Sequence, residues 1–418
     1  MTEFFESIVS DVSNIIKFDS SQAESREGMP FGEENAKCLE YFLALASSFG
    51  FETKNYDNYA GEVIWGDGED FAILAHLDVV PAGSGWSHAP FGGEIDRINR
   101  RVWGRGAMDD KGPAVITLYA LKALKDQGFK PRKTIKFILG CNEETGWACI
   151  DHYNKVAKMP ETGISPDADF PVIYAEKGIL HLKFAFKVSS PAFSGLKGGN
   201  LSNMVCDYCE VCADKVSEDL ERLGLYYDDG KIISRGKSAH GSTPERGINA
   251  IPAMLSYLGL DDVRRQLFEN KFGVGNLSDE TGVLTLSPNL IEQRGEIIYV
   301  TCDVRYPATL SRDFVLGKID ECGVPYEIMH DQNPLFNDKN GKLIQTLLNV
   351  YNEVTGKSAQ PIAIGGGTYA RALKYGAAFG PEEEGEENTI HQANEYITFE
   401  KIEKCFKIYK MAIERLCR

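Results

Sequence analysis

The sequence lacks an excess of basic residues, a long apolar run and a recognisable leader. Lys and Arg number 45 against 61 Asp and Glu, so the formal net charge is −16. Nucleic acids and anionic membrane surfaces attract basic proteins, so this balance argues against both as partners. No apolar stretch is long enough to span a bilayer, and the acidic start MTEFFESIVSDVSNIIKF lacks a basic segment followed by an apolar one. We therefore expect a cytoplasmic protein.

The ten cysteines are scattered and, with no secretory leader, are expected to be free thiols. One group, Cys206-x-x-Cys209-x-x-Cys212, resembles a metal-cluster motif. The surrounding segment, Ser202 to Leu223, is interpreted as a helix, in which position i+6 drifts away from the face of position i. No fourth cysteine lies near in the sequence, so we expect no cluster here.

The composition is that of an ordinary globular protein. The chain has 418 residues, 43% of them hydrophobic and 25% charged, which favours two or three domains. Helices are expected from the start to about Ile16 and from Glu33 to Phe49. The apolar run Phe71–Ala75 and the segment Lys133–Leu139 predict buried strands, with a helix at Pro113–Gly128 between them. This alternation favours an α/β domain with a mainly parallel sheet between helices.

After Lys177-Gly178 the predicted strands and helices no longer alternate as they do in the first part of the chain. Residues His181–Val188 alternate between apolar and polar, as in a half-exposed strand. Further elements are expected as strands at Lys231–Ser238 and Ile297–Tyr306 and as helices at Ser202–Leu223 and Gly247–Leu258. We interpret this region as an inserted α+β domain, one sheet covered by helices. The predicted boundaries are 1–178 and 326–418 for a discontinuous first domain and 179–325 for the insertion.

His76 and Asp78 directly follow the apolar strand Phe71–Ala75. Functional groups in α/β sheets collect at the carboxyl ends of strands, and positions i and i+2 of an extended segment share a face. A carboxylate beside a zinc-binding imidazole fixes its tautomer and raises its basicity. Taken alone, however, a His-x-Asp sequence is more often an ordinary polar pair.

Asp109 lies in the glycine-rich run Gly104-Arg105-Gly106-Ala107-Met108-Asp109-Asp110-Lys111-Gly112. The glycines indicate a tight loop where the backbone approaches another group closely. A carboxylate in such a loop can offer one oxygen to each of two cations. On spacing alone, a turn with capping Asp residues before a helix is the favoured explanation.

Glu143 and Glu144 follow the second predicted strand. Adjacent acidic residues after a buried strand are costly unless their charge is compensated, and a metal ion supplies that compensation. One carboxylate can then bind the ion while its neighbour accepts a proton from bound water. The alternative is a Glu-Glu pair that opens a helix, where the helix dipole favours acidic side chains.

Asp167 and His391 complete the set of candidate metal ligands. Two histidines and three carboxylates, one of them shared, give two zinc ions three protein ligands each and leave room for water, as in catalytic sites. Each signal is weak alone, but together they occur in a consistent order, most of them at strand ends. With Glu143 beside Glu144, the candidate site has six residues: His76, Asp109, Glu143, Glu144, Asp167 and His391.

The order of these motifs resembles a known family of zinc metallopeptidases. The family includes carboxypeptidase G, aminoacylase, succinyl-diaminopimelate desuccinylase and carnosinase, and the resemblance is closest to the bacterial PepV-type dipeptidases. It covers nearly the whole chain. The supporting runs are Pro166–Pro171, Gly236–Ser242, Gly247–Ala250 and Gly365–Arg371.

The resemblance implies a role for each residue of the first domain. Asp109 bridges two zinc ions, and the Asp109–Asp110 peptide is expected to be cis. The remaining ligands are His76 and Asp167 for one ion and Glu144 and His391 for the other. Asp78 orients His76, and Glu143 is the general base.

For the inserted domain the resemblance implies a lid that completes the site. His240 holds the oxyanion, and Asn203 and Arg305 contact the substrate. The loop Gly366, Gly367 and Thr368 cradles a substrate carboxylate. The insertion is shorter than expected for the PepV type and longer than the dimerisation domain of the desuccinylases. Because Asn203 and His240 match the PepV pattern, a monomer is favoured, with a homodimer as the alternative.

The predicted function is hydrolysis of a dipeptide, of the Xaa-Xaa or β-Ala/Xaa-His type, by zinc-activated water. An N-acyl amino acid deacylase would use the same site. A binding protein with an inactive metal site is the third hypothesis, and the intact Glu143-Glu144 pair and both histidines argue against it. Carboxylate-rich sites also accept manganese or cobalt in place of zinc. The expected partner is a small peptide substrate.

Overall fold

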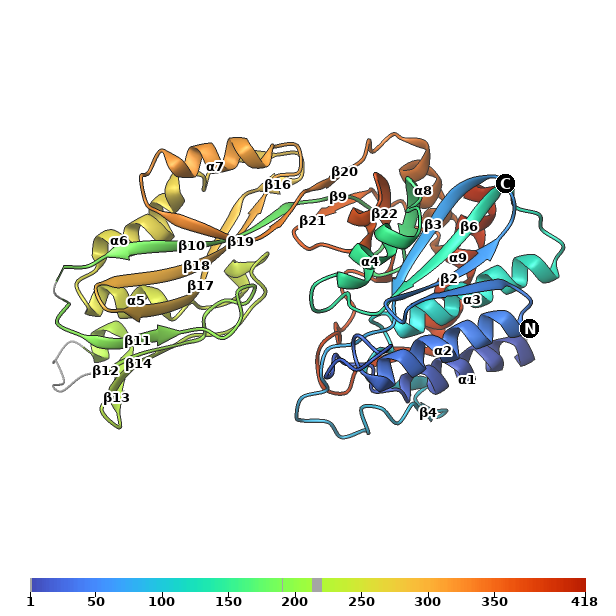
Figure 1. Cartoon of the computed structure of the whole chain (residues 1–418), viewed down its shortest axis with the longest axis horizontal. Helices are drawn as coiled ribbons and strands as arrows, with labels where there is room; N and C mark the ends of the chain where they lie inside the picture. The colour runs from blue at the N-terminus through green and yellow to red at the C-terminus, as the bar shows by residue number, and fades with distance from the viewer. Residues whose placement is uncertain (1, 190, 213–219) are drawn as a thin grey trace. The chain divides into compact units, whose positions relative to one another are not determined.

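The chain forms two compact units. The computed structural model describes residues 2–189, 191–212 and 220–418 (Figure 1). Unit 1 consists of Met1–Tyr174, Asn337–Ile362 and Thr368–Arg418, and unit 2 consists of Ala175–Phe336 and Ala363–Gly367. Among the described residues, no helix combines the length and the apolar character needed to cross a membrane.

Unit 1 is built on a mixed sheet that is parallel in its centre. The four central strands, in spatial order, are β6 (Lys133–Gly140), β3 (Glu69–His76), β7 (Thr162–Ser165) and β22 (Tyr375–Ala378). On the β6 side, β2 (Ala60–Trp65) and β1 (Glu52–Tyr56) continue the sheet antiparallel. On the β22 side, β9 (Ile173–Glu176) is antiparallel as well. The predicted α/β class is therefore confirmed, and its parallel part is the centre of the sheet.

Helices cover both faces of this sheet. Their bounds are α1 (Thr2–Ile16), α2 (Glu33–Ser48), α3 (Lys111–Asp126), α4 (Ala148–Val156), α8 (Lys342–Thr355) and α9 (Phe399–Cys417). Helix α2 packs its leucines over Gly61 of β2, whereas the hydroxyl of Tyr153 on α4 donates to Glu62 at 2.7 Å. Since Gly61 and Glu62 are consecutive strand residues, these two helices lie on opposite faces.

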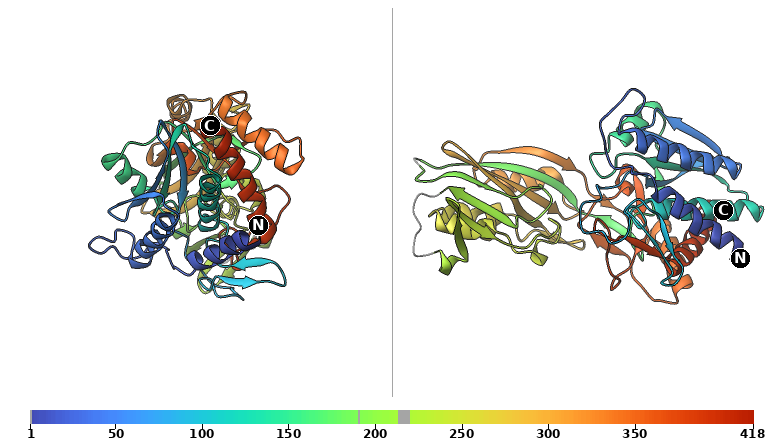
Figure 2. Two further views of the ribbon diagram at one scale, coloured as in Figure 1. Left: turned by 90° about the vertical axis from the view of Figure 1, so that its right-hand side faces the viewer. Right: turned by 90° about the horizontal axis from the view of Figure 1, so that it is seen from below.

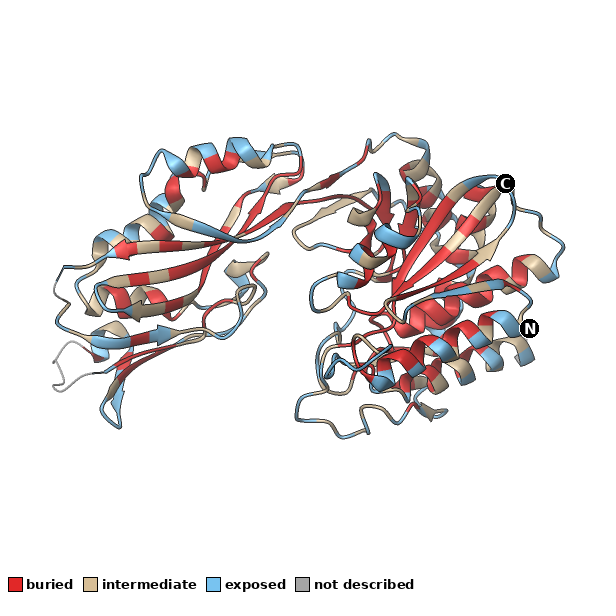
Figure 3. Cartoon of the chain, in the orientation of Figure 1, coloured by how far each residue is buried: buried red, intermediate tan, exposed pale blue. Residues whose placement is uncertain are grey.

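Strand β3 is apolar because it is enclosed on both faces. Residues Phe71 to Ala75 are all fully buried, as expected for a central parallel strand (Figure 3). Helix α3 follows the glycine-rich loop and is buried along most of its length. It ends before Gly128, whose φ of 76° is the left-handed conformation that glycine adopts at helix ends.

Unit 2 is one antiparallel sheet with helices along one face. Its strands, in spatial order, are β13 (Leu225–Asp228), β14 (Lys231–Arg235), β12 (Tyr208–Cys212), β11 (Ser194–Gly198), β17 (Thr285–Arg294), β18 (Ile297–Tyr306), β10 (Gly178–Lys187) and β19 (Tyr326–Gln332). The unit also contains helices α5 (Ile251–Tyr257), α6 (Asp261–Arg265) and α7 (Arg312–Asp320), and a small sheet of β15 (Ser278–Asp279) and β16 (Gly282–Val283). In the right-hand view of Figure 2 the yellow helices lie along one face of this sheet.

The core of unit 2 lies between that sheet face and the helices. Leu182, Phe184 and Phe186 of β10 point into it, together with residues of α5 and α7. Lys183, between Leu182 and Phe184, and Lys187, directly after Phe186, belong to the opposite face and are at least partly exposed. The predicted alternation of this strand and the predicted single sheet covered by helices are both confirmed.

The helix predicted for Ser202–Leu223 is wrong. Tyr208–Cys212 forms strand β12, which pairs with β11 and β14, and only Glu221–Leu223 is a short 3-10 turn. The predicted segment also includes residues 213–219, which lie outside the described residues. The sequence Tyr-Cys-Glu-Val-Cys is compatible with a strand or a helix. The segment forms a strand because it pairs with a neighbouring strand on each side. The helix predicted at Gly247–Leu258 is confirmed in its second part, as α5.

Candidate functional site

The candidate metal ligands of unit 1 follow the carboxyl ends of neighbouring parallel strands. His76 is the last residue of β3, Glu144 follows β6, and Asp167 follows β7. Because β6, β3 and β7 are adjacent and parallel, these three side chains emerge at the same edge of the sheet. His391 reaches this edge from the loop that precedes β24 (Tyr396–Thr398), and its φ of 61° is left-handed.

Asp109 lies between the two histidines and faces each with a different oxygen. Its Oδ1 is 2.9 Å from Nε2 of His76, and its Oδ2 is 3.0 Å from Nε2 of His391. Asp167 Oδ2 lies 3.6 Å from the His76 nitrogen, and Glu144 Oε1 lies 3.1 Å from the His391 nitrogen. The five side chains thus divide into two groups, each with one histidine and one carboxylate, and both groups share Asp109.

The carboxylates of this cluster crowd one another. Burial and the charge of Asp109 raise the pKa of Glu144 to about 7 and also raise the pKa of Asp167. Burial acts to lower the pKa of His391, but its hydrogen bonds with Asp109 and Glu144 outweigh this and raise the pKa to about 11. The cluster therefore favours additional positive charge, which a divalent cation supplies.

The donor set fits zinc. One ligand atom from each of His76, Asp109 and Glu144 can be chosen so that all lie within 4.8 Å of one another. Imidazole nitrogens and carboxylate oxygens are common zinc ligands, and three protein ligands for each ion leave a position open for water or substrate. The arrangement is that of a site able to hold two ions bridged by one carboxylate.

A buried ion pair holds the loop that carries Asp109. Arg105 and Glu395 are 2% and 0% exposed, and Arg105 Nη1 donates to Glu395 Oε2 at 2.7 Å. The other oxygen of Glu395 accepts from the backbone N–H groups of Met108 at 2.9 Å and Asp109 at 3.3 Å. Glu395 therefore fixes the backbone at the central carboxylate. The Asp109–Asp110 peptide is cis, as expected from the sequence.

The neighbouring Asp110 does not act as a helix cap. It stands at the position before α3, yet within the described chain its side chain makes no capping hydrogen bond. Instead, its Oδ2 accepts from the backbone N–H of His76 at 3.2 Å, and burial raises the pKa of this carboxyl well above its ordinary value. The alternative explanation of the glycine-rich run, a turn with capping Asp residues, is therefore wrong for Asp110.

Asp78 joins two segments of the site. Its two oxygens accept from the backbone N–H groups of Glu143 at 3.0 Å and Glu144 at 3.1 Å. Nδ1 of His76 lies 3.0 Å from the backbone oxygen of Asp78 and 3.5 Å from its Oδ1. Asp78 thus contacts the imidazole and also anchors the Glu-Glu turn beside it.

Glu143, next to Glu144, has one carboxylate oxygen fixed by a hydrogen bond. Its Oε1 accepts from Trp147 Nε1 at 3.1 Å, which fixes one of the two carboxylate oxygens. Burial raises the pKa of Glu143 well above its ordinary value, so the carboxylate takes up a proton more readily than a solvated glutamate. The Trp147 ring in turn packs edge-on against Tyr369, with centroids 5.0 Å apart.

Unit 2 brings together most of the predicted substrate residues. Arg305 is 4% exposed and donates from Nη1 to the backbone oxygen of Gly365 at 3.1 Å, directly before Gly366 and Gly367. The backbone oxygen of Asn203 accepts from Gly241 N at 2.7 Å. Nδ1 of His240, the residue before Gly241, lies 2.7 Å from the hydroxyl of Ser242.

The glycine loop of unit 2 packs beside the His240 segment. A Cβ atom added to Gly365 would lie only 2.9 Å from Cβ of Ser242. Arg305, Gly365, Ser242 and, through them, Asn203 and His240 therefore form one neighbourhood within unit 2. Thr368 is the first residue of the next unit 1 segment, where its hydroxyl accepts from Ala370 N at 3.1 Å.

Several residues of the site were given no role by the sequence analysis. Long-range partners such as Arg105 and Glu395, 290 positions apart, leave no local signal. Asp303 does leave one, because it stands two positions before Arg305 on β18 and so shares its face. Its carboxylate binds the Arg305 guanidinium through Nε at 2.7 Å and Nη2 at 2.9 Å.

The three spaced cysteines lie in and beside a strand rather than a helix. Cys206 and Cys209 are buried and Cys212 is exposed. The Sγ of Cys206 donates to the backbone oxygen of Tyr208 at 3.1 Å. Cys209 and Cys212 are three positions apart on β12, so their side chains point to opposite faces of the sheet.

Comparisons with known proteins identify what the chain is similar to. The sequence model of peptidase family M20/M25/M40 matches residues 72–415. The putative dipeptidase YtjP of Bacillus subtilis (strain 168) is 34% identical over 456 aligned positions, which cover 99% of this chain and 98% of that protein. The Beta-Ala-Xaa dipeptidase of Lactobacillus delbrueckii subsp. lactis is 33% identical over 457 positions, covering 99% and 96%.

A solved structure shows the same fold at low identity. The Bacillus subtilis YXEP protein, described as a dinuclear metal binding peptidase, superposes with a TM-score of 0.57 at 10% identity. The superposition covers 100% of this chain and 99% of that one. The fold of this chain is therefore similar to that of a known structure.

Proposed function

Because the chain belongs to peptidase family M20/M25/M40, we propose that it is a two-zinc dipeptidase that hydrolyses the amide bond of dipeptides of the Xaa-Xaa or β-Ala/Xaa-His type. The family resemblance seen in the motif order is confirmed by this match. The observation that carries the proposal is Asp109, which offers one oxygen to each of two histidine–carboxylate groups. The names of the two relatives, both dipeptidases, support the substrate class.

The ligands proposed for the two ions follow the two groups of the cluster. His76 and Asp167 would hold one ion, Glu144 and His391 the other, and Asp109 both. Bound zinc would polarise the amide carbonyl and lower the pKa of a water molecule. A solved relative of the same fold, described as a dinuclear metal binding peptidase, supports two ions over one.

Glu143 is proposed as the general base. Its carboxylate takes the proton of the attacking water and later delivers that proton to the leaving amine, so that no net proton is gained or lost at Glu143. The pKa of Glu143, raised by burial, suits the first step, because the carboxylate accepts a proton more readily than a solvated glutamate. Asp78 and Trp147 hold the Glu143 backbone and side chain in place for this exchange.

Unit 2 is proposed to supply the groups that recognise the substrate. His240 donates to the oxyanion, and Asn203 and Arg305 contact the peptide. Gly366, Gly367 and Thr368 receive its carboxylate. In enzymes with an oxyanion hole, loss of one donor costs about 2.7–4 kcal/mol of transition-state stabilisation, and we expect an effect of this order for His240→Ala.

The test is a zinc determination combined with a substrate panel. Zinc-loaded protein is expected to contain two ions for each chain and to cleave dipeptides faster than N-acetyl amino acids. Cleavage of N-acetyl amino acids without cleavage of any dipeptide would identify a deacylase instead. Two bound ions with no hydrolysis of either class would favour a binding protein. Gel filtration and fractionation of the source cells test the proposed monomer and cytoplasmic location.

A further inference from the structure

Asp303 is a buried carboxylate to which the proposed mechanism gives no role. It is 0% exposed and lies on the central strand β18, where its neighbours in register are His181 of β10 and Ser287 of β17. A buried carboxylate costs free energy unless it is paired and hydrogen-bonded. The groups that compensate Asp303 therefore indicate what it does.

The main partner of Asp303 is the guanidinium of Arg305. The two groups form a parallel, two-fold contact, from Nε to Oδ1 at 2.7 Å and from Nη2 to Oδ2 at 2.9 Å. The third nitrogen, Nη1, donates to the backbone oxygen of Gly365. These contacts, made within the described residues, engage three of the five N–H groups of the guanidinium. Among the described residues, one N–H on Nη1 and one on Nη2 have no further acceptor.

The Asp303 carboxylate also packs closely against Gly241, in the segment that carries His240. A Cβ atom on Gly241 would lie 2.3 Å from Asp303 Oδ2, so only glycine allows this close approach. Gly241 N donates to the backbone oxygen of Asn203 at 2.7 Å. Asp303 is therefore packed against the segments of three candidate substrate residues: Arg305, His240 and Asn203.

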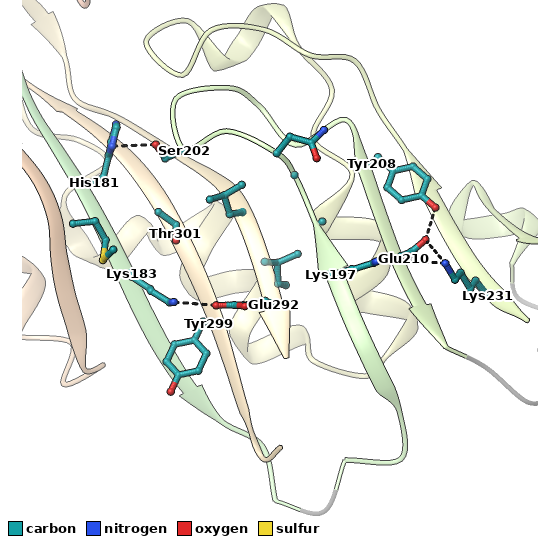
Figure 4. A pocket seen from close by; sticks show the side chains of 16 residues that line it. His181, Lys183, Lys197, Ser202, Tyr208, Glu210, Lys231, Glu292, Tyr299 and Thr301 are labelled. Carbon is teal, nitrogen blue, oxygen red and sulfur yellow. Dashed lines mark hydrogen bonds and ion pairs between the residues drawn. The ribbon is translucent and has the colours of Figure 1, made fainter. Parts of the chain in front are cut away.

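Polar contacts connect Asp303 to the face of the unit 2 sheet that is opposite its hydrophobic core. This face contains a cavity of about 800 Å³, and His181 and Ser202 are among the residues that line it (Figure 4). Nδ1 of His181 lies 3.2 Å from the Ser202 hydroxyl, and its Nε2 lies 3.8 Å from Asp303 Oδ1. Asn289 donates to the backbone oxygen of Ser202 at 2.6 Å, next to Asn203.

We propose that Asp303 is a positioning residue, which holds Arg305 ready to bind the free C-terminal carboxylate of the substrate. The inference rests on the proposed dipeptidase function. An arginine side chain that is already fixed loses little conformational entropy on binding, and its N–H groups keep the geometry that a carboxylate requires. Because Asp303 neutralises the guanidinium charge, recognition depends on this geometry, and the orientation set by Asp303 determines the preference for a free carboxylate.

The test compares a dipeptide with its C-terminal amide. The wild type is expected to prefer the free acid. Asp303→Asn keeps the size of the side chain but removes its charge and one acceptor, and it should reduce this preference about 10-fold to 100-fold, as loss of an outer partner does for metal ligands. The loss should appear in KM for the free acid, with kcat changed much less. The matched control is Glu292→Gln, which removes a partner of Lys183 on the same sheet and should leave the preference unchanged.

A second variant covers the case in which Asp303→Asn folds poorly. The double variant Asp303→Asn/Arg305→Gln replaces the buried ion pair by two neutral groups, so no charge is left uncompensated. It should show the same low preference as Arg305→Gln alone, because Asp303 acts through Arg305. An unchanged preference in Asp303→Asn, or a further loss in the double variant, overturns the inference while the dipeptidase function stands. Failure of the zinc-loaded wild type to cleave any dipeptide overturns both.

Discussion

The carboxylate of Asp109 faces two histidines and is held in place through the backbone of its loop. Both of its oxygens face histidines, so neither oxygen is available for a further hydrogen bond that would fix the orientation of the side chain. The backbone takes over this task, through the N–H groups of Met108 and Asp109 that bind Glu395. A central ligand of this kind is therefore positioned from its main chain, by a partner that is itself fixed by Arg105.

At the residue scale, Glu143 provides the most direct test of the mechanism. Glu143→Ala should retain both zinc ions and lose about 10²–10⁴-fold in kcat, the usual contribution of a general base. Glu144→Gln, the neighbouring change, should lose zinc, since Glu144 lies 3.1 Å from the His391 nitrogen within the cluster. Zinc content and steady-state rates measured on both variants check the assignment. Glu143→Ala at near wild-type rate contradicts it.

Glu210 gives a pH-dependent prediction in unit 2. Its carboxylate accepts from Tyr208 at 2.5 Å and from Lys231 at 3.0 Å, and these hydrogen bonds, the Tyr208 bond above all, lower its pKa to about 2. The unfolded chain therefore takes up this proton first as the pH falls, so the stabilisation by Glu210 is present above about pH 4.5 and is lost towards pH 2.

Hydrogen exchange of β12 and β14 measures this contribution. At pH 6 these strands should exchange faster in Glu210→Gln than in the wild type, and the difference should shrink as the pH falls below 4.5. One pKa unit corresponds to about 1.4 kcal/mol, so the full difference is a few kcal/mol at most. A difference that is constant over this pH range would show that the charge of Glu210 is not its cause.

Two of the residues predicted for the metal cluster, His76 and Glu144, follow strands that the sequence also predicted, whereas Asp167 follows β7, which it did not predict. His76, Glu144 and Asp167 each follow a strand, and parallel strands bring such positions to one edge. Arg105 and Glu395 were given no role, because their pairing depends on how distant loops meet. Asp303 could have been inferred from its spacing to Arg305, since both are on a recognised strand.

At the scale of elements, the start of α3 leaves no space for a side chain larger than that of glycine at Gly112. The helix begins two residues after Asp109, and a Cβ atom on Gly112 would lie 2.0 Å from the backbone oxygen of Ala107. Backbone cannot move away as a flexible side chain can, so any larger residue must displace the loop that carries Asp109.

Gly112→Ala should therefore weaken zinc binding and lower the unfolding temperature. Alanine normally stabilises a helix interior relative to glycine by roughly 0.5–1 kcal/mol, so the sign of the effect is diagnostic. The matched control is Gly317→Ala in α7, where a Cβ would meet no atom within 4 Å and the ordinary gain is expected. Thermal unfolding and zinc affinity of both variants check this, and a stabilised Gly112→Ala would contradict the described packing.

The segment around Cys206 shows why some elements were not predictable. Val205, Cys206, Cys209 and Cys212 repeat at intervals that suit a helix, yet Tyr208–Cys212 is a strand. Its conformation follows from hydrogen bonds to β11 and β14, which come from other parts of the chain. The central strand β3, in contrast, contains the continuous apolar run Phe71–Ala75 and was recognised from its own sequence.

At the scale of the whole molecule, the tryptophans separate the two units experimentally. All four, Trp65, Trp86, Trp103 and Trp147, belong to the segment Met1–Tyr174 of unit 1. Tryptophan fluorescence therefore reports the unfolding of the unit that contains the metal cluster, whereas circular dichroism reports both units.

Zinc should stabilise the fluorescence transition. Ions that bind only the folded state at 100 times their Kd contribute about 2.7 kcal/mol each, and removal by a chelator reverses this. In His391→Ala the zinc-dependent shift should be smaller, because one proposed ion loses a ligand. A fluorescence midpoint that does not respond to zinc or chelator would contradict the proposed metal centre.

The division of the chain has a consequence for exchanging parts between relatives. Unit 2 takes most of its residues from Ala175–Phe336, but Ala363–Gly367 belongs to it as well. The short piece matters, because the oxygen of Gly365 accepts from Arg305. A chimera that imports Ala175–Phe336 alone would place a foreign arginine beside five native residues. Moving both segments together keeps the two partners of this contact from the same parent.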